Sequence, residues 1–107
     1  MLNRPSERAD AVLTDCKEKV SDKCSLVHCD LQSFDSVRAA AAKVKETFAS
    51  EGIDALVCNA GVMGVKDEAT PDGFDVQMQT NHLSHFLLTM ELLPVSRDAV
   101  LAIYGSF

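Results

Sequence analysis

The stretch Ile53-Asp54-Ala55-Leu56-Val57-Cys58-Asn59-Ala60-Gly61 decides the fold of this chain. Its apolar run ends abruptly at Asn-Ala-Gly. Such a run, bounded by a turn signal, predicts a strand buried on both faces, as in a parallel sheet. The turn lies at the carboxyl end of that strand, where open α/β sheets bind their ligands. The sequence therefore predicts a candidate binding site at residues 59–61.

Helical and strand patterns alternate on both sides of this run. Ser6 and Ser33 can each cap a helix, and Gly52 can end the second helix in a left-handed conformation. Alternation of this kind predicts right-handed crossovers and a parallel sheet with helices on both faces. A turn is predicted at Thr70-Pro71-Asp72-Gly73. The expected elements are a helix over 6–20 with an apolar stripe (Ala9, Val12, Leu13, Cys16, Val20), a strand over 25–29, a helix over 33–52, the strand 53–58, a helix over 74–93 stopped by Pro94, and a strand over 99–104.

The composition limits the classes of partner. The 107 residues form one domain, with a net charge of −6 and a pI near 4.8, so neither nucleic acid nor an anionic membrane is an expected partner. The amino-terminal residues lack the apolar core of a signal peptide, and the longest apolar helix pattern is too short to cross a bilayer. A cytoplasmic location is expected, with an organelle or an association with a membrane as the alternative.

The cysteines and histidines do not form a recognisable metal motif. Cys29 and Cys58 fall in or beside predicted strands and are expected to be reduced and buried. His82 and His85 lie three residues apart on a predicted helix, but no third ligand accompanies them. We therefore predict no metal site.

A second marker, Asn81-His82-Leu83-Ser84-His85-Phe86, follows Gly61 by twenty residues. Together with Asn59-Ala60-Gly61 after a buried strand, it resembles the short-chain dehydrogenase/reductase family. The sequence of residues 81–86 is similar to the retinol-dehydrogenase-like branch of the family, which often has Asn-His-Leu-Gly-His-Phe at this place. This chain has Ser84 where that branch has the glycine. The resemblance covers roughly residues 2–95.

This resemblance implies a fold and an activity. The fold would be an incomplete Rossmann-type doubly wound sheet, with residues 1–107 forming part of an NAD(P)-binding domain. The family transfers hydride between a nicotinamide and a carbonyl or alcohol carbon of a small molecule. Asn81 matches the asparagine that holds a water in the proton relay, and Ser106 falls where some members place the catalytic serine. Asn81 could also kink the helix by bonding the backbone, and this role is compatible with the one in the proton relay.

The resemblance also implies a set of cofactor-binding residues. Arg4 matches an arginine that contacts the 2′-phosphate of NADP, which favours NADP and leaves NAD open; a solvated surface arginine is the alternative. Asp30 matches an adenine-contacting aspartate, or it caps the next helix. Gly61 would let the backbone pass close to a ligand or adopt positive φ. The alternative is that Gly61 only forms the turn at the end of the strand. The implied cofactor-binding residues are Arg4, Asp30, Leu31, Asn59, Ala60 and Gly61.

Two parts that the family requires are missing from this sequence. None of the five glycines fits the glycine-rich phosphate loop, and no Tyr-x-x-x-Lys pair occurs. Tyr104, the only tyrosine, falls in a predicted strand and is not assigned the catalytic role. The chain thus resembles the central part of the domain and is not expected to be active alone. The alternative is a non-catalytic fragment or pseudoenzyme that acts through weak nucleotide binding or dimerisation.

Two structural expectations follow. The doubly wound order places a first strand between the second and fourth, so strands 25–29 and 53–58 would lie roughly 14 Å apart without it. Because such a gap exposes strand edges, we expect these two strands to pair directly. In the family, the helix corresponding to 74–93 often packs in a dimer. Its apolar residues Phe86, Leu87 and Met90 could serve a homodimer here.

Overall fold

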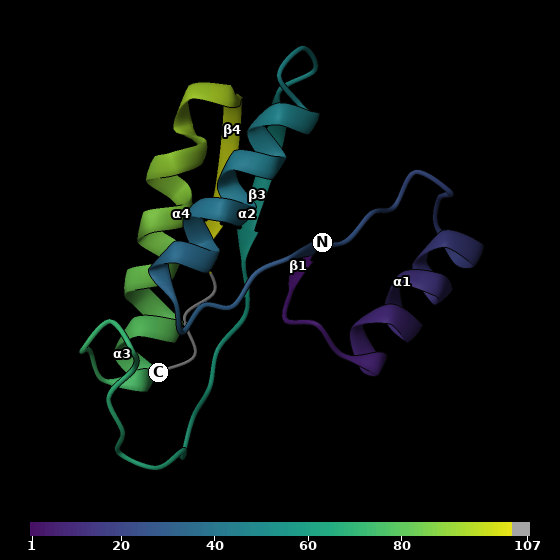
Figure 1. Ribbon diagram of the computed structural model, residues 1–107. Coiled ribbons are helices and arrows are strands. Elements are labelled where there is room, and N and C mark those ends of the chain that lie inside the picture. Colours follow the sequence, from purple (N-terminus) through teal and green to yellow (C-terminus); the bar gives the residue numbers. More distant parts are fainter. Residues whose placement is uncertain (104–107) are drawn as a thin grey trace.

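The computed structural model describes the backbone of residues 1–103 and the side chains of residues 1–97 (Figure 1). Its elements, in order, are β1 (Leu2–Asn3), α1 (Glu7–Lys19), β2 (Val27–His28), α2 (Phe34–Thr47), β3 (Ile53–Cys58), α3 (Val76–Met78), the π-helical turn η1 (Gln79–Leu83), α4 (Ser84–Leu92), the 3₁₀ turn η2 (Leu93–Val95) and β4 (Ser96–Ile103). The predicted α/β class, an incomplete doubly wound parallel arrangement, is confirmed.

The strands form two separate parallel pairs. β1 pairs with β2, placing Leu2 opposite Val27, and β3 pairs with β4. The predicted direct pairing of strands 25–29 and 53–58 is therefore wrong. The reason is local connectivity, because α1 joins β1 to β2 and the α3–α4 segment joins β3 to β4, so that each pair is a β-α-β unit.

Serine side chains begin the first two long helices, as predicted. The Ser6 hydroxyl accepts a hydrogen bond from the Ala9 N–H at 3.1 Å, and Ser33 accepts one from the Ser36 N–H at 3.3 Å. After α2, Gly52 has φ +77°, the left-handed conformation that glycine adopts at lowest cost. These local signals fix where α1 and α2 begin and where β3 starts.

The core lies where α2 and α4 pack against each other (Figure 1). The Lys45 Nζ and a Glu91 carboxylate oxygen join the two helices at 2.9 Å across a partly buried ion pair. Small residues on α2 allow the close approach, and larger ones on α4 fill the remaining space. The buried cluster consists of Cys29, Val37, Ala40, Ala41, Val44, Leu88 and Leu92.

The opposite face of β3 is open, which corrects the prediction of a strand buried on both faces. Cys58 is 2% exposed, whereas Val57 is 58% exposed. Among the described helices, α2 and α4 both lie on one side of the β3–β4 pair, and α1 stands apart from them (Figure 1). Of the stripe predicted on α1, only Ala9 is buried, and Val20 is 78% exposed. No described helix therefore covers the face of β3 opposite α2 and α4.

The predicted helix 74–93 is interrupted rather than continuous. Its first turn, α3, passes into the π-helical turn η1, which contains Asn81, before α4 begins. Pro94 lies in η2, where the helix ends as predicted. A π turn inserts one extra residue per turn and re-aims the side chains around it, and such turns often occur at functional sites.

A buried polar network holds the loop before this helix. The predicted turn at Thr70–Gly73 is confirmed, because the Gly73 N–H donates to the Thr70 carbonyl at 2.9 Å. Gln79 is fully buried; it accepts from the Thr70 hydroxyl and donates to Asp72 at 2.7 Å. The same Asp72 oxygen accepts from the Phe34 N–H at 2.8 Å. The loop is thereby tied to the amino end of α2.

Candidate functional site

A groove of about 1070 Å³ separates the two strand pairs. Leu2 and Asn3 of β1 line one side, and residues of β3 from Ile53 to Val57 line the other. An apolar floor lies between them, formed by Val44 of α2, Phe48 at the C-cap of α2, and Leu88 and Leu92 of α4. The groove therefore lies between an edge of β1 and an edge of β3, and no described strand pairs with either edge there.

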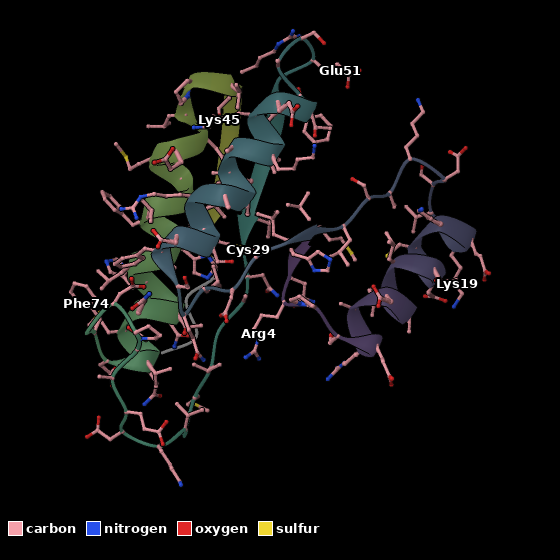
Figure 2. All side chains as sticks on the ribbon, in the orientation of Figure 1. Arg4, Lys19, Cys29, Lys45, Glu51 and Phe74 are labelled. Carbon is pink, nitrogen blue, oxygen red and sulfur yellow. The ribbon has the colours of Figure 1, made fainter. Side chains whose placement is uncertain are left out.

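The residues that the sequence assigns to cofactor binding all line this groove. They come from three separate segments, the ends of β1, β2 and β3, and the fold brings these ends together. Figure 2 shows the Arg4 side chain extending from the end of β1 toward the loop after β3. The lining residues in question are Arg4, Asp30, Leu31, Asn59, Ala60 and Gly61.

Asp30 does not cap α2, so that alternative is wrong. Ser33 is the N-cap, and the Asp30 side chain instead accepts a hydrogen bond from the Gln32 N–H at 2.9 Å. This bond forms a local turn just after β2. One carboxylate oxygen is used by this bond, which leaves acceptor capacity at the groove.

Gly61 permits a close approach to Asn81, and its φ is not positive. The glycines of the described chain with positive φ are Gly52, Gly64 and Gly73. A Cβ added at Gly61 would lie 3.2 Å from the Asn81 side-chain oxygen. The residue therefore makes room for the Asn81 amide, and the loop can pass close beside η1.

Asn81 joins the π turn to the loop after β3. Its side-chain oxygen accepts from the Val62 N–H at 2.8 Å, and its amide nitrogen donates to the Val62 carbonyl at 2.8 Å. The backbone-bonding role expected of Asn81 is thus present. An asparagine side chain offers two donors and two acceptor lone pairs, so one of each remains for another partner.

Two further residues on the same helix face make similar contacts. Ser84 is fully buried and donates to the Leu31 carbonyl at 2.5 Å. The His85 Nε2 lies 2.8 Å from the Ala60 carbonyl oxygen. We call Asn81, Ser84 and His85 the polar clamp, because together they hold the loops after β2 and β3 against one helix.

Sequence reasoning assigned no role to Ser84 or His85, although a signal exists. Thr80, Ser84, Leu88 and Leu92 follow one another at four-residue spacing, and all four are buried. The apolar end of this row identifies the buried face of the helix. Extending the row backward identifies Thr80 and Ser84 as buried polar residues that need partners.

Two polar atoms beside the groove lack partners among the described residues. They are the Thr80 hydroxyl oxygen and the His85 Nδ1, in side chains of residues only 6% and 8% exposed. Both residues line the groove. Since buried polar atoms in folded proteins are nearly always paired with protein groups or ordered water, both atoms are available to a water or to a bound group.

The two buried cysteines are protected rather than activated. Burial raises the pKa of the Cys29 thiol, and the neighbouring Asp30 carboxylate raises it further. Burial also raises the pKa of Cys58, partly offset by a hydrogen bond with Thr89. A raised pKa leaves the thiol protonated at neutral pH, so neither cysteine is suited to nucleophilic chemistry.

The other candidates that the sequence raises are the pair His82 and His85, Tyr104 and Ser106. His82 is exposed while His85 is buried, and among the described side chains, those of residues 1–97, no cluster of three potential ligands could hold a metal ion. Ser106 and Tyr104 lie outside the described residues. Across the described chain, no helix combines the length and apolar character needed to traverse a bilayer.

Parallel β-α-β units with a ligand groove at the strand ends define a Rossmann-type nucleotide-binding domain. The model of the short chain dehydrogenase family matches residues 1–100. The chain therefore belongs to the short-chain dehydrogenases, a family of oxidoreductases.

Known relatives agree with this membership. Human retinol dehydrogenase 13 is 42% identical over 91 residues, which is 84% of this chain and 27% of that protein. The chloroplastic protochlorophyllide reductase of Marchantia paleacea is 40% identical over 85 residues, 74% of this chain and 18% of that protein. The chain thus spans about a quarter or less of these relatives.

Solved structures show the same fold. A crystal structure of a protein from Mycobacterium paratuberculosis matches with a TM-score of 0.72 and 35% identity, covering 90% of this chain and 32% of that one. The RhlG/NADP complex of Pseudomonas aeruginosa matches with a TM-score of 0.67 and 30% identity, covering 88% of this chain and 36% of that one.

Proposed function

We propose that this chain supplies the adenosine-facing part of an NADP-binding site in a short-chain oxidoreductase domain. The observation that carries the proposal is the meeting of Arg4, Asp30 and the Asn59–Gly61 loop along one groove. Bound NADP would supply the hydride acceptor for an alcohol carbon, or NADPH the donor for a carbonyl carbon. The similar solved structure of Pseudomonas aeruginosa RhlG is a complex with NADP, and this supports the choice of cofactor.

The residues present fit one end of that cofactor. Arg4 is exposed at the groove, and a guanidinium binds a phosphate through charge-assisted, bidentate hydrogen bonds. Asp30 retains acceptor capacity for an adenine amine. The sequence has no glycine-rich loop to seat the pyrophosphate. We therefore propose weak binding that favours NADP over NAD.

Asn81 is proposed to serve the proton relay of the complete domain. Its two bonds to Val62 fix the orientation of the amide, and its spare donor and lone pair can hold one water. The catalytic tyrosine and lysine are absent from the sequence, so we propose that this chain alone does not turn over substrate. In the complete domain, we propose a small carbonyl compound or alcohol as the substrate.

A titration of the purified chain with NADPH and NADH, followed by fluorescence, tests the cofactor proposal. We expect Arg4→Ala to weaken NADPH binding about tenfold, in line with about 1.4 kcal/mol for a charged hydrogen bond, and to leave NADH binding unchanged. Arg38→Ala is the matched control, because Arg38 is an exposed arginine of α2. Equal effects on both nucleotides, or no binding to the unaltered chain at millimolar NADPH, would contradict the proposal.

A second assay tests the proposal that the chain is inactive. Absorbance at the nicotinamide band is followed with a panel of retinoids, steroids and aldehydes. We expect no turnover above the rate without protein. Turnover that depends on this chain would overturn the proposal.

A homodimer through α4 is a second proposal, supported by exposed apolar residues. Phe86, Met90 and Leu93 recur at helical spacing on α4 and the start of η2, and they are 62%, 49% and 52% exposed. Leu87, also considered for this role, instead packs against the core. An exposed apolar stripe on a helix is typical of a surface that binds another protein.

A further inference from the structure

We infer that Cys16 and Cys24 form a reversible oxidation site, at which their two thiols join as one disulfide across the carboxyl end of α1. The disulfide connects the last turns of α1 to the segment that leads into β2. The oxidant is a small-molecule disulfide, for which glutathione disulfide serves as the probe. Neither cysteine lines the groove, so this site does not depend on the proposed cofactor binding.

The Cys24 sulfur lies beside the part of α1 that carries Cys16. The Cys24 Sγ is 3.9 Å from the Cys16 carbonyl oxygen. That oxygen and the Cβ of Cys16 are separated by three bonds, so the Cys24 sulfur lies within about 7 Å of the carbon that holds the second sulfur. Changes in χ1 move each sulfur among three staggered positions, and these movements supply the remaining approach.

The backbone between the two cysteines is already folded into a compact turn. The Cys16 carbonyl accepts hydrogen bonds from the N–H groups of Val20 at 2.9 Å and Ser21 at 3.1 Å. The Cys24 N–H donates to the Ser21 carbonyl at 3.2 Å, and the Lys23 N–H donates to the Ser21 hydroxyl at 3.2 Å. Because closing a loop costs conformational entropy, a turn that is closed in the thiol form favours the disulfide within one chain.

Both thiols are accessible to a small disulfide. Cys16 and Cys24 are free and partly exposed, whereas Cys29 and Cys58 are only 4% and 2% exposed. Burial also raises the pKa of the Cys29 and Cys58 thiols, and the thiolate is the form that attacks a disulfide. Exchange is therefore expected at Cys16 and Cys24 and not at the buried pair.

The reaction balances with glutathione disulfide as the oxidant. The thiolate of one cysteine attacks a sulfur of glutathione disulfide, the bond between the two glutathione sulfurs breaks, and one glutathione leaves as a thiolate. The thiolate of the second cysteine then attacks the protein sulfur of this mixed disulfide, and the second glutathione leaves. The protein loses two electrons and two thiol protons, and the two glutathiones gain them.

The disulfide fastens a helix that stands apart from the core. In Figure 1, α1 lies away from the packed helices α2 and α4. Its buried residue, Ala9, is near the amino end, and the C-cap residue Val20 is 78% exposed. A cross-link between residues 16 and 24 restricts the unfolded chain, so it favours the folded form of this end of α1.

The test treats the whole 107-residue chain with glutathione disulfide at neutral pH. We expect the intact mass to fall by two hydrogens, and two of the four thiols to remain after denaturation. Trypsin cleaves after lysine, and Lys17, Lys19 and Lys23 lie between the two cysteines. A digest without reductant should therefore contain the peptide with Cys16 joined to the peptide with Cys24, and a reductant should separate them.

Amide exchange gives a second, local readout. In the oxidised chain, the N–H groups that close the turn should exchange about tenfold more slowly than in the reduced chain. Cys16→Ser and Cys24→Ser should each abolish this slowing, and each should retain one glutathione as a mixed disulfide. The double variant Cys29→Ala/Cys58→Ala is the control and should still form the disulfide. Circular dichroism checks that each variant keeps its helices.

Four results would overturn the proposal. The first is an unaltered chain that keeps all four thiols. The second is a lasting glutathione adduct on the unaltered chain, which would show that the two sulfurs do not meet. The third is oxidation that only links separate copies of the chain, as seen on a non-reducing gel. The fourth is loss of two thiols that Cys16→Ser and Cys24→Ser leave unchanged, which would assign the reaction to the buried cysteines.

Discussion

Asn81 holds the backbone of Val62 through two hydrogen bonds, one to the N–H and one to the carbonyl, each 2.8 Å long. The bonds join a π turn to a loop nineteen residues earlier in the chain. Gly61, next to Val62, has no side chain to block the approach. The asparagine of the second sequence marker is therefore bonded to the residue that directly follows the first marker, Asn59-Ala60-Gly61.

Replacing Asn81 tests this contact. Asn81→Ala leaves the Val62 N–H and carbonyl unpaired, so we expect the free energy of unfolding to fall by about 1–3 kcal/mol. Urea denaturation followed by circular dichroism measures the change. His82→Ala is the control, because His82 is the exposed neighbour and surface changes stay within about 0.5 kcal/mol. Equal effects for the two variants would show that the contact contributes no stability.

Ser84 occupies the position where the retinol-dehydrogenase-like branch often has glycine. Ser84→Ala removes the bond to the Leu31 carbonyl, and we expect a loss of about 1–3 kcal/mol in urea denaturation. Ser84→Gly should lose about 1 kcal/mol more, because glycine is a poorer helix former. Ser25→Ala, at an exposed serine, should change little. A Ser84→Gly variant as stable as the unaltered chain would show that the bond is dispensable.

Thr80→Val should stabilise the chain when nothing fills the groove. The Thr80 hydroxyl is buried without a partner among the described residues, and such a group costs about 1–3 kcal/mol. We expect the free energy of unfolding to rise by about 1 kcal/mol. Thr14→Val is the comparison, since the Thr14 hydroxyl bonds the Asp10 carbonyl on the exposed side of α1. A destabilised Thr80→Val variant would mean that the hydroxyl already has a partner.

The cysteines predict a pattern of reactivity with a thiol reagent. Cys29 and Cys58 are buried and have raised pKa values, whereas Cys16 and Cys24 are partly exposed. Mass spectrometry after timed alkylation at pH 8 should find Cys16 and Cys24 modified first. Cys29 or Cys58 reacting as fast as Cys16 would contradict the burial that we describe.

The same cysteines predict a loss of stability at alkaline pH. Their pKa values in the folded chain lie above the ordinary 9.0, so above pH 9.0 the unfolded chain releases protons that the folded chain retains. The stability that the two protonated thiols contribute is fully present below pH 9.0, and it is lost as the pH rises through the pKa values of the thiols in the folded chain. The double variant Cys29→Ala/Cys58→Ala should show a shallower decline in unfolding free energy. An unchanged slope would assign the decline to other groups.

The proposed dimer predicts an effect at Phe86. Light scattering after size exclusion should show an association that increases with concentration, and Phe86→Glu should abolish it by placing a charge in an apolar contact. Val20→Glu, at an exposed apolar residue of α1, should leave the association intact. A chain that stays monomeric at millimolar concentration would rule the dimer out.

The sequence by itself determined the elements and the family. Ser6 bonds Ala9 and Ser33 bonds Ser36, and contacts over three residues form wherever the local sequence permits them. The same holds for the left-handed Gly52 and for the turn at residues 70–73. The apolar run 53–58 also predicted a strand without reference to the rest of the chain.

Only the tertiary structure decided which strand edges pair, which face of β3 is covered and what the polar clamp contacts. Ser84 and Leu31 are 53 residues apart, so their bond depends on how α4 packs against α2. The sequence predicted that β2 and β3 would meet, but each pairs instead with the strand at the other end of its own β-α-β unit. Strand pairing joins residues far apart in the sequence, and local strand preferences do not specify which edges meet.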